Sequence, residues 1–126
     1  MERYDPEVAP DPKEWLALDE GERTLLVELY HRDARIPLPK RARSPHAVIH
    51  TIVENQLALD DQTIVRETLE RLMKEGLRRH QALHAIGSVL IEYLNDLLRA
   101  NKPSTDAHAP YYAALQRLTV EKRRDG

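Results

Sequence analysis

A long stretch without proline most constrains how this chain folds. All eight prolines lie between Pro6 and Pro45 or at Pro103 and Pro110, so residues 46–102 contain none. Proline breaks helices, and the apolar residues of this block recur at helical spacing. We therefore expect the block to form the helical centre of an all-α protein.

Three central helices are predicted within and just before this block. The first spans 44–58, with Ser44 as its N-cap and Pro45 at its first helical position. The second runs from about residue 62 to 75, and Gly76 is a good helix stop. The third occupies 78–101 and ends before Pro103.

Flanking segments complete a single small helical bundle. Residues 1–12 read as an extended, proline-rich arm, and a short helix then begins at Asp11-Pro12 and carries the only tryptophan, Trp15, which we expect to dock on the bundle. A helix over 20–32, an extended crossover over 36–43 and a final helix over 110–121 follow, before a charged tail over 122–126. The predicted domain thus spans 13–121.

Composition narrows the function classes. A chain of 126 residues suits one domain, and it contains no apolar run near the roughly 20 residues that span a bilayer and no signal-peptide core. We therefore expect a cytoplasmic protein without a membrane partner. The absence of cysteine restricts any metal ligands to nitrogen and oxygen, and the net charge of −2 disfavours a dedicated nucleic-acid binder.

Two pairs of histidines stand out on the first and third central helices. His46 and His50 are four residues apart, as are His80 and His84, so each pair shares one helix face. On a helical wheel both pairs join the apolar, inward-facing stripe. Short connections should make neighbouring helices antiparallel, so that the first and third run parallel and bring both pairs to one end of the bundle.

Inward-facing imidazoles need partners, because an unpaired buried ring nitrogen costs about 1–3 kcal/mol. A divalent transition ion such as Zn, Fe or Ni would satisfy them, and Glu54 would be a further ligand, an acceptor for a ring N–H, or a surface residue. Two alternatives remain open: histidines satisfied by hydrogen bonds in a polar core, and a pocket for a small anionic ligand in which histidines transfer protons.

Other candidate residues are less specific. His-Glu-x-x-His is absent from both pairs, which argues against a metalloprotease, and Glu28-x-x-His31 reads as surface because it falls away from the seam of Leu25 and Leu29. His108 reads as solvated. Gly87, one turn after His84, indicates close approach of another helix or of a bound group. Five cations (Lys40, Arg41, Arg43, Arg78 and Arg79) flank the helix starts, either as solvated charges or as a site for phosphate or carboxylate.

Short motifs resemble a bacterial domain family of unknown function whose members share histidine-bearing helices. The motifs are Val53-Glu54-Asn55-Gln56-Leu57-Ala58, Glu75-Gly76-Leu77, Arg79-His80 and His84-Ala85-Ile86-Gly87-Ser88. The similarity covers residues 15–119 and is strongest over 46–87. It implies a small cytoplasmic all-α domain and no established activity.

The sequence therefore predicts a divalent-metal-binding protein, with metal-dependent catalysis left open. Its predicted ligands are His46, His50, His80 and His84, assisted by Glu54. The alternative is a non-catalytic helical module for interaction or homo-oligomerisation, in which the histidines are structural.

Overall fold

The computed structural model describes residues 1–35, 43–60, 63–100 and 109–119. These ranges contain six helices and no strand, which confirms the all-α prediction. The helices are α1 (Pro12–Ala17), α2 (Glu20–Asp33), α3 (Arg43–Leu59), α4 (Thr63–Lys74), α5 (Arg79–Ala100) and α6 (Ala109–Arg117). None of these described helices combines the length and apolarity needed to cross a lipid bilayer.

Local sequence signals set most of the helix ends. The Asp11 side chain accepts hydrogen bonds from two N–H groups of α1, and Asp19 accepts one from Glu22 in α2, as N-caps do. Gly76 follows α4 with a φ of 114°, a conformation that glycine adopts without strain. Two boundaries differ from prediction: α3 begins at Arg43, ahead of Ser44, and α6 ends at Arg117 rather than near residue 121. The predicted crossover falls almost entirely outside the described residues.

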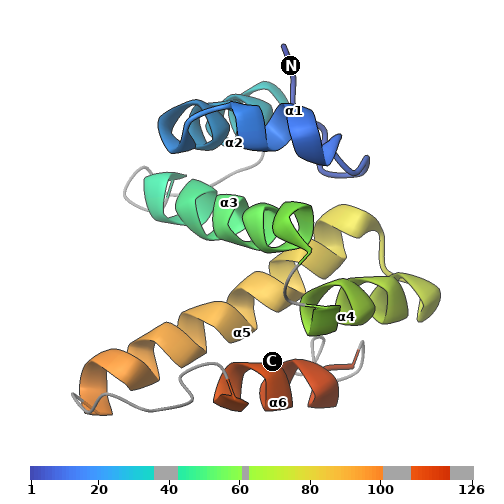
Figure 1. The fold of residues 1–126 in the computed structure, drawn as a ribbon, viewed down its shortest axis with the longest axis vertical. Coiled ribbons are helices and arrows are strands. Elements are labelled where there is room, and N and C mark those ends of the chain that lie inside the picture. Colours follow the sequence, from blue (N-terminus) through green and yellow to red (C-terminus); the bar gives the residue numbers. More distant parts are fainter. Residues whose placement is uncertain (36–42, 61–62, 101–108, 120–126) are drawn as a thin grey trace.

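Helix α3 lies between two apolar clusters (Figure 1). The upper core, on its α1 and α2 side, consists of Tyr4, Trp15, Val27 and Ala47. The lower core joins α3 to the three later helices, and its buried members are Val53, Val65, Leu69, Leu72, Leu77, Ala82, Leu83, Ala85, Ile86, Leu90, Tyr111 and Leu115. Trp15 is fully buried in the upper core, as predicted. Residues on α3 can therefore contact both halves of the molecule.

The first and third central helices are not parallel. In Figure 1, α3 runs from left to right, whereas α5 runs from upper right to lower left and crosses it. Short connections keep consecutive helices close, but the ridges and grooves of their side chains set the crossing angle. The prediction of parallel helices is therefore wrong. The two helices pass each other in opposing directions, so that His46 lies beside His84 and His50 lies beside His80.

Candidate metal centre

Five of the six histidines gather where α2, α3 and α5 meet. They are His31 on α2, His46 and His50 on α3, and His80 and His84 on α5. The ring centroids of His46 and His84 lie 4.7 Å apart, and those of His50 and His80 lie 5.4 Å apart. The predicted meeting of the two histidine pairs is therefore present in the fold. The sixth histidine, His108, lies outside the described residues.

His31 was predicted at the surface, and that prediction is wrong. Its side chain is buried, and its ring centroid lies 5.3 Å from that of His80 and 5.4 Å from that of His50. The buried face of α2 runs through Val27 and His31, one turn apart, while Leu25 on the expected seam is 53% exposed. A helical wheel of α2 that places Val27 at the centre of the buried face also places His31 on that face.

Four histidines have ligand atoms close enough to share one ion. One ring nitrogen from each of His31, His50, His80 and His84 lies within 4.8 Å of the other three. His46 belongs to the cluster but not to this group of four, although the sequence placed it among the ligands. The group therefore draws its nitrogens from three helices rather than from two.

These spacings are wider than those around a bound ion. A tetrahedral zinc ion with bonds of about 2.0–2.1 Å holds its ligand atoms about 3.4 Å apart. The four rings would therefore need to draw together by up to about 1.4 Å, starting from the 4.8 Å limit. Side-chain rotation covers such a shift without moving a helix axis.

Hydrogen bonds orient His31 toward the cluster. Its Nδ1 lies 2.8 Å from the carbonyl oxygen of Val27, which only accepts, so Nδ1 carries the proton. Its Nε2 therefore presents a lone pair, and the Nε2 of His46 lies 3.1 Å away and donates to it. A metal-ligating histidine commonly donates its other ring N–H to a backbone carbonyl in this way.

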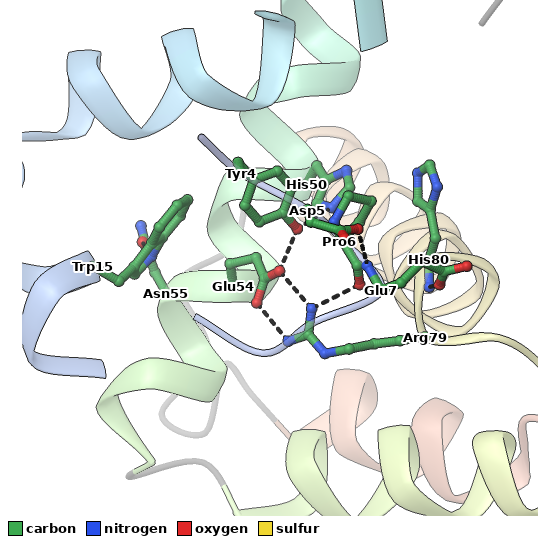
Figure 2. Close-up of polar contacts among 10 residues, drawn as sticks. All are labelled: Tyr4, Asp5, Pro6, Glu7, Trp15, His50, Glu54, Asn55, Arg79 and His80. Atoms are coloured by element: carbon green, nitrogen blue, oxygen red, sulfur yellow. Dashed lines mark hydrogen bonds and ion pairs between the residues drawn. The ribbon is translucent and has the colours of Figure 1, made fainter. Parts of the chain in front are cut away.

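A buried ion pair lies behind the cluster. Arg79 donates to both oxygens of the Glu54 carboxylate at 2.8 Å, and the two side chains are 6% and 1% exposed. Figure 2 shows the Arg79 guanidinium facing this carboxylate, with the Tyr4 hydroxyl donating to one of its oxygens. Burial and the negative charge of Glu54 raise the pKa of Tyr4, which keeps its proton.

This ion pair fixes the proton on His50. The Tyr4 hydroxyl has one proton, which it donates to Glu54, so its oxygen accepts from the His50 Nε2 at 2.7 Å. Nε2 is then protonated and Nδ1 carries the lone pair. The His50 Nδ1 is buried without a hydrogen-bond partner in the described part of the chain. The chain of hydrogen bonds from Arg79 through Glu54 and Tyr4 to His50 therefore ends at the His50 Nδ1, whose lone pair can bind a cation.

Two sequence interpretations change as a result. Glu54 is neither a surface residue nor part of the group of four; its carboxylate is held by Arg79 and Tyr4 and acts on His50 through the phenol. Arg79 is not a solvated helix-flanking cation but the partner of that carboxylate. Arg78 is exposed and pairs with Glu7 at 3.7 Å, while the side chains of the other three flanking cations lie outside the described set.

The N-terminal arm contacts the same ion pair and the start of α5 (Figure 2). The carbonyl oxygen of Pro6 accepts from Arg79 at 2.9 Å, and the Glu7 carboxylate accepts from the backbone N–H of His80 at 2.7 Å. Tyr4 is 4% exposed and Pro6 is fully buried. Nothing in the sequence pattern predicted these contacts, because a proline-rich arm carries no periodicity that reveals its partner.

Burial keeps the histidines neutral. Burial and then the neighbouring rings lower the pKa of His50 to about 2, and burial and the nearby His31 lower that of His80 to about 4. Burial also lowers the pKa of His46. These three rings are therefore neutral at pH 7. Each has a ring nitrogen with a lone pair, so no proton has to leave before that nitrogen binds a cation.

The stability of the metal-free protein should depend on pH. In the unfolded chain these histidines titrate near pH 6.5, whereas folded His50 and His80 titrate at about 2 and 4, so the unfolded state binds protons first. The free energy of unfolding should therefore fall as the pH drops from about 7 to 5, by up to about 1.4 kcal/mol per pH unit for each ring. Urea unfolding in the presence of chelator measures this slope, and a flat profile would contradict buried neutral rings.

Tyr4→Phe tests the chain of hydrogen bonds behind His50. The change removes the acceptor of the His50 Nε2–H and one donor to Glu54, so it should lower the free energy of unfolding by about 1–3 kcal/mol. It should also weaken zinc binding by about 10–100-fold, as loss of an orienting partner does. Tyr30→Phe retains a phenyl ring beside Tyr4 and serves as the control. Zinc affinity equal to that of the unmodified protein would show that Tyr4 does not orient His50.

Comparisons with protein-family models, with curated proteins and with solved structures found no match. The resemblance to a bacterial domain family therefore stays a prediction.

Proposed function

We propose that this protein binds one divalent transition-metal ion through His31, His50, His80 and His84. The observation that carries the proposal is the set of four ring nitrogens that lie within 4.8 Å of one another. Neutral imidazoles suit zinc, iron or nickel, whereas magnesium and calcium prefer oxygen ligands. Zinc is the natural first ion to test.

Hydrogen bonding in the cluster supports this proposal. The His50 Nδ1 and the His80 Nε2 are buried without a hydrogen-bond partner within the described ranges. Each such nitrogen costs about 1–3 kcal/mol, and a cation among the rings would remove that cost. The ring nitrogens of His31 and His50 that face away from the proposed ion already donate to an acceptor, as in metal-ligating histidines. The His31 Nδ1 donates to the Val27 carbonyl and the His50 Nε2 donates to the Tyr4 hydroxyl.

Zinc stoichiometry of protein purified without a histidine tag tests the proposal. The protein is stripped with chelator, incubated with zinc, passed over a desalting column and analysed for metal content. We expect one zinc ion per chain, and we expect the double variant His50→Ala/His84→Ala to retain almost none.

Ser88→Ala provides the matched control. Ser88 lies one turn after His84 on α5, is exposed, and donates only to the backbone carbonyl of His84 among the hydrogen bonds described. This variant should retain one zinc ion. The proposal would be overturned if the unmodified protein retained no zinc after desalting, or if the double variant retained as much zinc as the unmodified protein.

A further inference from the structure

A groove between α3 and α5 opens directly beside the histidine group. Its volume is about 270 Å³, and His46, His50 and His84 are among the residues that line it. Since a water molecule occupies about 30 Å³ of liquid, the groove has room for about nine waters or one small organic molecule. This volume lies just below the roughly 300–1,000 Å³ of pockets that hold drug-sized ligands, so it suits a small organic molecule.

The remaining walls of the groove are largely apolar. Ile49 projects from α3, and Leu83 and Ile91 project from α5. Ser88 adds one hydroxyl, and none of the described residues that line the groove carries a carboxylate or a permanent positive charge. This lining favours a ligand with a short aliphatic part and disfavours phosphate groups, which proteins bind with Arg or Lys.

His46 has a donor to offer such a ligand. Without metal, its Nε2–H donates to the Nε2 lone pair of His31 at 3.1 Å. An ion that binds the Nε2 of His31 takes that lone pair, so the His46 N–H loses its acceptor. His46 lines the groove. Its freed N–H can therefore donate to a ligand atom in the groove, next to the ion.

The charge balance of the metal-bound cluster favours an anion. Four neutral imidazoles leave the double positive charge of the ion uncompensated, and the nearby Glu54 carboxylate is already neutralised by Arg79. Burying unbalanced charge is costly, so an anion beside the ion would stabilise the complex. A carboxylate has two oxygens: one can bind the ion as a fifth ligand, beside the four imidazoles, and the other can accept from the His46 N–H.

We infer that the groove binds a small aliphatic monocarboxylate, with its carboxylate between the metal ion and His46 and its chain along Ile49, Leu83 and Ile91. This inference depends on the proposed metal binding. Gly87 also lines the groove, where α3 approaches closely: an added Cβ would come 3.1 Å from Cγ2 of Ile49.

Visible absorption of the cobalt-loaded protein provides the test, because the cobalt bands respond to a change of ligands around the ion. Acetate, propanoate and butanoate are titrated separately at constant ionic strength. We expect saturable changes, with affinity rising by up to about fourfold for each added methylene, the gain for burying one CH₂. Equal affinities for the three acids would overturn the inferred apolar contact.

Two variants separate the contributions. His46→Phe keeps a ring of similar shape but removes the donor, so it should weaken cobalt binding by less than about tenfold, and at saturating cobalt it should bind all three acids about tenfold or more weakly. Gly87→Ala should weaken butanoate more than acetate. If cobalt does not bind, the proposed function fails; if cobalt binds but carboxylates cause no saturable change, or His46→Phe binds them unchanged, only the carboxylate inference fails.

Discussion

Replacing His31 with alanine should lower the zinc affinity by more than about 100-fold. One ring nitrogen of His31 belongs to the group of four ligand atoms, and its Nδ1 lies 2.8 Å from the Val27 carbonyl oxygen, which leaves Nε2 as the nitrogen that can bind an ion. Losing a direct ligand should exceed the roughly 10–100-fold loss that follows removal of an outer partner. Competition with a chromophoric chelator at pH 7.5 measures the affinity.

His46→Ala is the matched comparison for this prediction. His46 lies in the same cluster, and its Nε2 is 3.1 Å from that of His31, but it is outside the group of four. We expect its loss to weaken zinc binding by less than about tenfold, the low end of the effect of an outer partner. The opposite order of the two variants would restore the ligand set predicted from the sequence and contradict the one inferred from the structure.

Arg79→Met should lower the free energy of unfolding of the metal-free protein by about 3–5 kcal/mol, because it leaves a buried carboxylate without its cation. Glu54 is 1% exposed, so its carboxylate depends on protein partners rather than on bulk water. For a domain of this size the melting temperature should fall by about 10–20 °C. Thermal unfolding followed by circular dichroism measures the change.

A double variant distinguishes loss of charge pairing from loss of packing. Arg79→Met/Glu54→Leu replaces the buried pair with apolar side chains of similar size, a change that is often neutral for stability. The double variant should therefore unfold at a higher temperature than Arg79→Met alone. If Arg79→Met melts within about 2 °C of the unmodified protein, Glu54 is not the buried, ionised partner described above.

Local signals explain why most of the fold was predictable. Asp11, Asp19 and Gly76 act within a few residues of themselves, so their effects on helix ends can be read directly from the sequence. Periodicity identifies the inward face of each helix, so the inward direction of both histidine pairs was predictable, but the parallel arrangement expected to bring the pairs together is absent. The crossing of α3 and α5 was not predictable, since it depends on how several side-chain surfaces fit.

The remaining parts of the site depend on contacts between segments distant in sequence. His31 has no histidine one turn away on α2, and its burial follows from the packing of Val27 against α3. Tyr4 reaches His50 across 46 positions of the chain. Neither contact produces a periodic pattern. Cellular location and nucleic-acid binding stay predictions from composition, and homo-oligomerisation stays the alternative interpretation of the helices.

A crystal structure of the zinc-loaded protein, with anomalous diffraction recorded at the zinc edge, tests the central claim most directly. The account predicts one anomalous peak among His31, His50, His80 and His84, about 2.0–2.1 Å from one ring nitrogen of each. A peak elsewhere on the molecule, or no peak at stoichiometric zinc, would contradict the proposed metal centre.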